Sequence, residues 1–341
     1  MIIIDKQHRA PALAQTALLA FWVGVILVTY VGPPPAAHVD AKNSADQFFQ
    51  DLLVGGAVGG TIYLEVSLKP SLFAKARTED ERWAVWDDFF KRVVGGPDIS
   101  RKGPAPYWGD LVYHILDSQY VADSASLELG TVVRVRSPRE LVGAKVRGYE
   151  IHHNEANQSD LLLAIAKPVS GGKMYDTEFL VARGDLPACR HSCKNTKASP
   201  TATTIEQIRT IMRKGLDPKK KGLAEDFVVL QGHFTKPNEV QYVVYYHRYP
   251  DSAEYSEDLE RLRSWRTVIL DDRLSMIAVV RGESVYPQVK PTSVGDINGD
   301  GLDEIWADLW NYEGSQRGIA YWRGRIERES FGLVVTRYQG P

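Results

Sequence analysis

The sequence is poor in cysteine and methionine, and it has no excess of either charge. Only two cysteines and four methionines occur among 341 residues, which excludes a disulfide-rich scaffold. The 41 basic and 43 acidic residues nearly balance, and they are interspersed without long runs of one sign, so no nucleic-acid or polyanion partner is predicted. With 44% hydrophobic and 25% charged residues, the chain can bury a core of one large or two medium domains.

The chain also lacks the short motifs of common catalytic sites. Neither G-x-S-x-G nor H-E-x-x-H occurs in the sequence. The glycine-rich segment 55–60 is followed by Thr61 and a strand-like run, so it does not fit a phosphate loop, which needs Lys and Ser or Thr before a helix. Nothing local therefore identifies a reaction, although catalytic groups that are distant in sequence leave no such motif.

One long hydrophobic run occurs, and it lies near the N-terminus. Ala12 to Val31 is mainly apolar and is long enough to span a bilayer. Lys6 and Arg9 precede the run and three prolines follow it, which predicts the N-terminus inside and the C-terminus outside the cytoplasm. Two outcomes fit: a retained membrane anchor, or a signal peptide cleaved near Ala37 or Ala41, which would leave a secreted or periplasmic protein.

The two cysteines lie close together, at Cys189 and Cys193. In an oxidising compartment they are expected to form a small disulfide. A metal site that also uses His191 is an alternative, but zinc prefers four ligands and no second cluster is present. Two free thiols are the third possibility.

The clearest predicted helix runs from Thr78 to Val94. Thr78 and Glu81 form a capping box, and two glycines follow the helix. Apolar residues recur at spacings of three and four, so we expect one aromatic face to be buried in the core. This face consists of Trp83, Trp86, Phe90 and Val93 or Val94.

Residues 127–182 are rich in β-branched residues separated by turn residues, which predicts sheet strands. His152 and His153 are adjacent, so on a strand they point to opposite faces, and we expect both to be exposed. A further helix is predicted from about Thr204 to Lys214, with Thr203 and Glu206 as a possible capping box.

These patterns predict an α+β fold. It would comprise an N-terminal transmembrane or signal helix, a region of helices and sheet, and a mostly antiparallel β domain with propeller-blade-like hairpins. The predicted units are the hydrophobic segment 1–41, an α+β domain over 42–200 and a β-rich domain over 201–341.

The segment 295–305, GDINGDGLDEI, carries oxygen-bearing residues at alternating positions. Alternate positions of a tight loop converge on one cation, Gly299 and Gly301 permit the turn, and calcium takes six to eight oxygens. Asp303 is expected to point away from the cation. The predicted calcium ligands are the side chains of Asp296, Asn298, Asp300 and Glu304 and the carbonyl of Leu302.

The loop has two other possible interpretations. An EF-hand would need a hydrophobic residue at position 8 and glutamate at position 12, where the chain has Asp303 and Ala307. The EF-hand interpretation therefore fails. Asn-Gly and Asp-Gly also form turns between strands without any metal, and this simpler alternative stays open.

The loop resembles the DxNGDGxxD/E loop of FG-GAP and VCBS-type repeats of exported and surface proteins. That resemblance implies a calcium loop between two strands of a β-propeller blade or a related sheet. It is confined to the C-terminal third of the chain, and Glu304 stands where the family more often has aspartate. A fainter copy without its metal ligands is suggested at Gly232 to Glu239.

The function expected from these features is that of an exported, non-catalytic protein with a structural calcium loop. Calcium would stabilise the module by binding only its folded loop. The expected partners are an unknown envelope protein or glycan, and the membrane through the N-terminal segment. Trp306, Trp310 and Trp322 either line a binding surface or belong to the core. The alternatives are an extracytoplasmic hydrolase with the calcium loop as scaffold, and an anchored sensor or assembly subunit.

Overall fold

The computed structural model describes residues 41–96, 99–102, 104–116, 119–155, 159–169, 172–187, 200–213, 223–250, 266–281, 288–310, 315–324 and 331–335. All of them belong to one compact unit that spans residues 40–341. The hydrophobic segment with Ala12 to Val31 and the two cysteines lie outside the described residues. Within those ranges, no helix combines the length and apolar character that a bilayer crossing requires.

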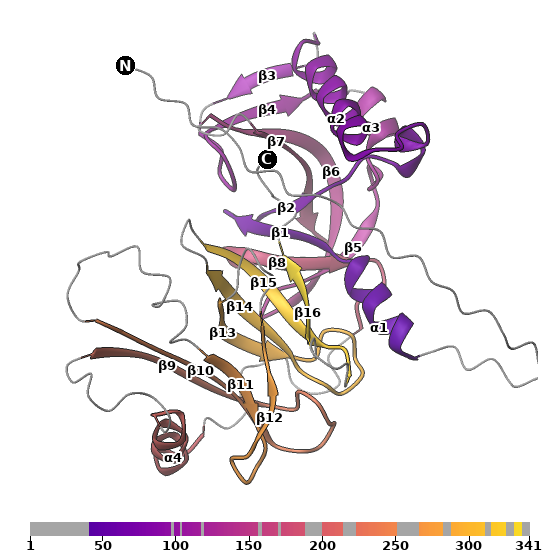
Figure 1. Cartoon of the computed structure of the whole chain (residues 1–341). Helices are drawn as coiled ribbons and strands as arrows, with labels where there is room; N and C mark the ends of the chain where they lie inside the picture. Colours follow the sequence, from indigo (N-terminus) through magenta and orange to yellow (C-terminus); the bar gives the residue numbers. More distant parts are fainter. Residues whose placement is uncertain are drawn as a thin grey trace, which may run out of the picture. The chain divides into compact units, whose positions relative to one another are not determined.

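The predicted α+β class is wrong, whereas the β-rich character is confirmed. Antiparallel strands dominate both halves of the described chain, and helices are few and peripheral (Figure 1). The helices are α1 (Ala41–Gln50), the 3₁₀-helix η1 (Pro70–Phe73), α2 (Glu79–Val94), α3 (Gln119–Ser124) and α4 (Ala202–Arg213).

The strands fall into three sheets. The first has the order β3-β4-β6-β5-β8-β1-β2-β7, the second β12-β11-β10-β9 and the third β13-β14-β15-β16. The strands of the first sheet are β1 (Leu53–Val58), β2 (Thr61–Glu65), β3 (Ile99–Lys102), β4 (Leu111–Ile115), β5 (Val132–Arg136), β6 (Leu141–Asn154), β7 (Ser159–Pro168) and β8 (Thr177–Arg183). Those of the other two are β9 (Leu223–Gly232), β10 (Gln241–Pro250), β11 (Arg266–Leu270), β12 (Met276–Val279), β13 (Gln288–Gly295), β14 (Glu304–Trp310), β15 (Ser315–Trp322) and β16 (Phe331–Val335).

Six strands of the first sheet close into a ring, because β7 pairs with both β2 and β6. The ring continues from β6 through β5, β8 and β1 back to β2. The long strand β6 uses one edge for two partners, with β5 along its first half and β4 along its second. Apolar side chains from all six strands, together with α2 and α3, form one core cluster.

Helix α2 begins where the sequence predicts. Thr78 caps it, and Thr78 and Glu81 form the reciprocal capping box. The predicted face is right at Val93, which is buried, and at Trp86 and Phe90, which pack against the core, but Trp83 is 51% exposed and the unpredicted Phe89 is buried. The position of the ring core, rather than the aromatic spacing, selects the face of this helix that is buried.

The second and third sheets pack against each other, and each also packs on further elements through its outer face. Phe234, Val243 and Ile269 meet Val289, Ile305 and other residues of the third sheet in one core cluster. The opposite face of the third sheet packs on α1, β1 and β8 through a further cluster that includes Trp306. Trp306 is 3% exposed, so it is a core residue rather than part of a binding surface. The predicted domain boundary near residue 200 stays a prediction.

Helix α4 covers the outer face of the second sheet. Ile208 and Met212 are buried against strands β10 and β11. Thr201 accepts a hydrogen bond from the backbone N–H of Thr204, so the helix begins earlier than predicted and Thr203 is not its cap.

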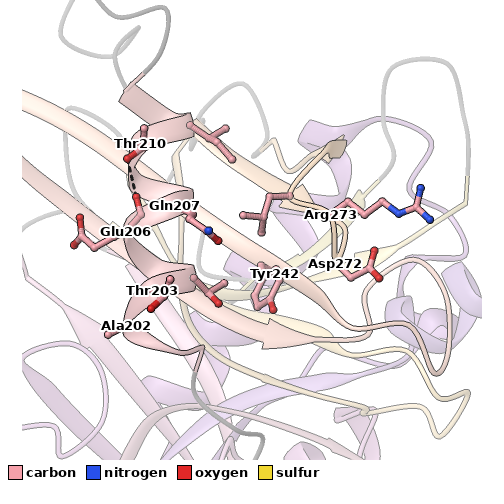
Figure 2. A pocket seen from close by; sticks show the side chains of 11 residues that line it. Ala202, Thr203, Glu206, Gln207, Thr210, Tyr242, Asp272 and Arg273 are labelled. Carbon is pink, nitrogen blue, oxygen red and sulfur yellow. Dashed lines mark hydrogen bonds between the residues drawn. The ribbon is translucent and has the colours of Figure 1, made fainter.

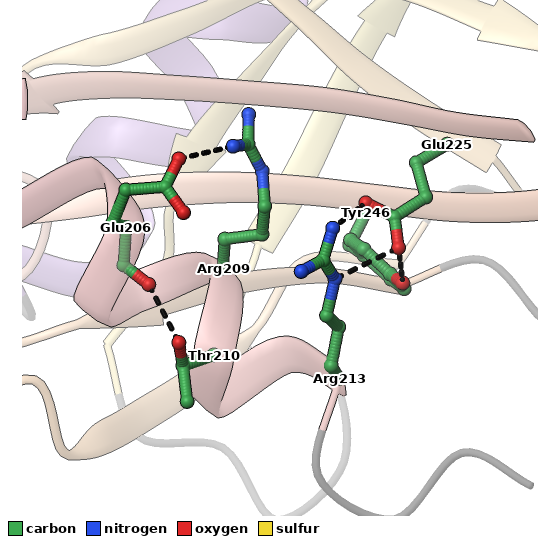
Figure 3. A network of polar contacts seen from close by, with 6 residues as sticks. All are labelled: Glu206, Arg209, Thr210, Arg213, Glu225 and Tyr246. Carbon is green, nitrogen blue, oxygen red and sulfur yellow. Dashed lines mark hydrogen bonds and ion pairs between the residues drawn. The ribbon is translucent and has the colours of Figure 1, made fainter. Parts of the chain in front are cut away.

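A polar network fastens the C-terminal end of α4 to the same sheet (Figure 3). Arg213 donates to both carboxylate oxygens of Glu225, from Nε at 2.9 Å and from Nη2 at 2.6 Å. The Tyr246 hydroxyl donates to the same carboxylate at 2.9 Å. The bond from Arg213, followed by the smaller effect of Tyr246, lowers the pKa of Glu225, which is otherwise raised by burial. This two-pronged geometry fixes the helix more firmly than a single ion pair would.

Candidate calcium loop

The predicted loop joins β13 to β14, and Gly295 pairs with Glu304 at its base. Gly299 and Gly301 have φ angles of 80° and 92°, a left-handed conformation that glycine adopts without steric cost. The Asp296 carboxylate lies inside this turn. Its Oδ1 accepts from the Gly299 N–H at 2.6 Å and its Oδ2 from the Gly301 N–H at 3.1 Å.

The next two candidate ligands repeat this local pattern. Asn298 Oδ1 accepts from the backbone N–H of Asp300 at 3.0 Å, and Asp300 Oδ1 accepts from that of Leu302 at 2.7 Å. Asn298 also donates from its amide to Asp300 Oδ2 at 2.9 Å. The Asp300 carboxylate is exposed, so the open side of the loop faces solvent.

Glu304 is the most buried of the candidate ligands, at 2% exposure. Its carboxylate accepts from the Ile297 N–H at 2.5 Å. Burial raises the pKa of Glu304 well above its ordinary value, and the charges of Asp300, Asp296 and Asp303 add to this effect. Burial also raises the pKa of Asp296, which is 8% exposed.

A buried arginine from the first sheet faces this loop. Arg136, on β5, is 3% exposed, and its Nη1 lies 3.5 Å from the Ile297 carbonyl oxygen. Burial lowers the pKa of Arg136, against the attraction of the Glu304, Asp296 and Asp303 carboxylates. Its guanidinium therefore supplies positive charge to a group of carboxylates that otherwise repel one another.

Asp303 points away from the turn, as expected, and links it to the β9–β10 hairpin. Its Oδ2 accepts from the His233 N–H at 2.7 Å, and its own N–H donates to the His233 carbonyl at 2.6 Å. Gly232 is needed beside this link, because a Cβ atom there would lie 2.9 Å from Asp303 Oδ2. No local pattern of residues predicts this link or the approach of Arg136 to the loop, because both join segments that are far apart in the chain.

The residue types of the loop suit calcium, but their side chains do not converge on a common cation position in this structure. Within the described ranges, no three His, Cys, Asp or Glu side chains are grouped as a metal site requires, because the loop carboxylates are turned toward backbone N–H groups. Every candidate ligand is nevertheless an oxygen donor, which is the type that calcium prefers. Burial is the main cause of the raised pKa values of Glu304 and Asp296, and neighbouring carboxylates raise them further, so a cation bound in the loop would favour the charged form of both groups.

Two adjoining clefts lie near the loop that Asp303 contacts. One, of about 960 Å³, separates α4 from the β11–β12 turn and is lined by Tyr242, Asp272 and Arg273 (Figure 2). The other, of about 1190 Å³, shares those three residues and is lined on its other side by the β9–β10 loop, including Asn238. The side chains of Tyr242, Asp272, Arg273 and Asn238 make no hydrogen bond to any described residue, which leaves them available to a ligand.

The predicted exposure of the adjacent histidines is wrong for His152, and His153 is only partly exposed. His152 is fully buried, and His153 lies on the opposite face of β6 against Asp160. Sequence periodicity places them on opposite faces but does not reveal what covers each face. The Glu150 carboxylate contacts His152, and no local motif in the sequence predicts this contact.

No family model, no curated protein and no solved structure matches this chain. The resemblance to FG-GAP and VCBS-type repeats therefore stays a prediction that rests on the loop residues alone.

Proposed function

We propose that the protein is an exported, calcium-stabilised binding module of the cell envelope, and that the loop from Asp296 to Glu304 is its structural calcium site. The loop itself would take no part in catalysis. Asp296, Asn298, Asp300 and Glu304 would supply side-chain oxygens, the Leu302 carbonyl another, and water the rest. The observation that carries the proposal is the buried, poorly compensated carboxylate pair Asp296 and Glu304 within a turn whose donors are all oxygen.

Calcium at this position would hold three parts of the fold together. The loop contacts β5 through Arg136 and the β9–β10 loop through Asp303. A cation that binds only the folded loop stabilises the native state by mass action, by about 2.7 kcal/mol when its concentration is 100 times its dissociation constant. Removing calcium would therefore loosen contacts between sheets as well as the loop.

The two clefts are the proposed binding surface. Their available groups are an aromatic ring with a hydroxyl at Tyr242, a carboxylate at Asp272, a guanidinium at Arg273 and an amide at Asn238. Polar groups of mixed sign beside an aromatic ring suit a glycan or a polar segment of an envelope protein. Calcium would act on this surface through Asp303 and the β9–β10 loop, which lines one cleft.

The test is a calcium titration of the purified chain. Calcium should raise the melting temperature, and the increase should disappear in the variant that carries Asp296→Ala and Asp300→Ala. Asp272→Ala, outside the loop, is the matched control and should keep the full response. If calcium binds the parent neither by calorimetry nor by thermal shift, the proposed metal site is refuted.

The envelope location follows from the N-terminal hydrophobic segment and is tested separately. A reporter fused to the C-terminus should be active outside the cytoplasm. Activity inside the cytoplasm would contradict the proposed topology without affecting the calcium site.

A further inference from the structure

Three chemically complementary side chains stand in one row across the first sheet. Ser100 on β3 pairs directly with His114 on β4, and His114 pairs directly with Glu150 on β6. Directly opposed residues of antiparallel strands point to the same face, with Cβ atoms about 4.5–5.5 Å apart. The register therefore places a hydroxyl, an imidazole and a carboxylate side by side, in that order.

Hydrogen bonds fix the carboxylate end of this row. His114 Nδ1 lies 2.7 Å from Glu150 Oε1, and the other oxygen, Oε2, lies 3.0 Å from His152 Nε2. His152 Nδ1 lies 2.9 Å from the carbonyl oxygen of Trp108. A carbonyl and a carboxylate both only accept, so both ring nitrogens of His152 face acceptors, and its ring orientation is set between Glu150 and the covering loop.

Exposure increases from His152 through Glu150 to His114. His152 is fully buried, the Glu150 side chain is 9% exposed and the His114 side chain is 30% exposed. Ser100 is also partly exposed. With Nδ1 of His114 bonded to Glu150, Nε2 makes no hydrogen bond to a described residue and remains available to accept a proton.

We propose that Ser100, His114 and Glu150 form a catalytic triad that hydrolyses acyl esters. Ser100 is the nucleophile, His114 the general base and Glu150 the group that orients and stabilises the imidazolium. His152 is a positioning residue, since it acts through Glu150. This site goes beyond the proposed calcium module and does not depend on it.

The reaction proceeds in two steps, the acylation of Ser100 and the hydrolysis of the acyl-enzyme. His114 Nε2 takes the proton of Ser100 Oγ as Oγ attacks the ester carbonyl carbon. The bond from that carbon to the leaving oxygen breaks, the released alcohol takes the proton from His114, and the acyl group stays on Ser100. Water then attacks the acyl-enzyme while His114 accepts its proton, and the acid leaves as the proton returns to Ser100 Oγ.

The edge position of β3 provides suitable donors for the oxyanion that forms in each step. β3 is the terminal strand of the first sheet, and no other described strand pairs with its outer side. Backbone N–H groups along such an edge have no partner strand. Donors of this type, aimed at developing negative charge, are the usual source of transition-state stabilisation in acyl transfer.

The test uses the full chain, purified in detergent, with two probes. A fluorophosphonate should label Ser100 covalently, as located by mass spectrometry of the digested protein. p-Nitrophenyl acetate should be hydrolysed, and Ser100→Ala should abolish both labelling and turnover. His114→Gln and Glu150→Gln should each lower kcat by roughly 100-fold or more.

The opposite face of β6 supplies a matched control. His153 Nδ1 lies 3.0 Å from Asp160 Oδ1, but its partner on β4 is Leu111, which has no nucleophile. His153→Gln should keep full activity. His152→Gln should lower kcat with little change in KM and shift the pH profile of kcat, whereas a merely structural defect would instead lower the amount of folded protein.

Several outcomes would overturn the proposal. These are labelling at a residue other than Ser100, turnover that survives in Ser100→Ala, and equal losses in His114→Gln and His153→Gln. Circular dichroism of each variant distinguishes loss of catalysis from loss of folding. Because Asp296→Ala tests only the calcium site, the failure of one proposal leaves the other intact.

Discussion

Replacing Arg136 by methionine should reveal how the loop carboxylates are compensated. Methionine keeps much of the apolar stem but removes a buried guanidinium that faces Glu304, Asp296 and Asp303. Removing one partner from a buried ion pair costs about 3–5 kcal/mol, because the remaining charge stays buried. We therefore expect the free energy of unfolding of this variant to be lower by about this amount in calcium-free buffer.

Calcium should reduce that loss. A bound divalent cation supplies positive charge to the same carboxylates, and without Arg136 it no longer meets a repelling guanidinium. The variant should accordingly gain more from calcium than the parent does, and its calcium affinity should increase.

The assay is thermal unfolding of both proteins with EDTA and with calcium. At about 2–4 °C per kcal/mol, the calcium-free variant should melt roughly 6–20 °C below the parent, and the gap should narrow in calcium. Arg134→Met, on the same strand, is the control for loss of charge on β5. An equal gap in both buffers would refute the idea that Arg136 and calcium serve the same carboxylates.

Four further substitutions test the packing and the Arg213–Glu225 ion pair. Trp306→Ala should cost about 3–5 kcal/mol by chemical denaturation, since it empties a core position, whereas Trp83→Ala on the exposed face of α2 should change stability by less than about 0.5 kcal/mol. The Arg213 bond lowers the pKa of Glu225. The stability that this bond adds is therefore present above pH 4.5 and is lost as the pH falls through the lowered pKa of the folded state. Glu225→Gln should weaken the dependence of stability on pH in the acid range, and an unchanged dependence would contradict this role of the bond. Gly56→Ala should destabilise the fold by about 1–3 kcal/mol, because its Cβ would lie 2.2 Å from the ring that covers it, and unchanged melting would argue against that close contact.

Local chemistry determined several features directly. The capping box of Thr78 and Glu81 depends on residues three positions apart, and it marks the start of α2 as expected. The β-rich character follows from runs of β-branched residues. The turn at Gly299 and Gly301 likewise depends on conformational freedom that only glycine has at low cost.

Other features were decided only by tertiary contacts. The α+β class was wrong because sequence patterns do not show that β7 pairs with two strands and closes a ring. The ring core also chose Phe89 over Trp83 as the buried face of α2.

The row of Ser100, His114 and Glu150 shows the same limit most clearly. No motif joins these residues, because their proximity depends on the register between three strands that are far apart in the chain. A shift of one residue would turn each side chain to the opposite face. The sequence by itself determined which chemical groups are present, and tertiary pairing decided which of them meet.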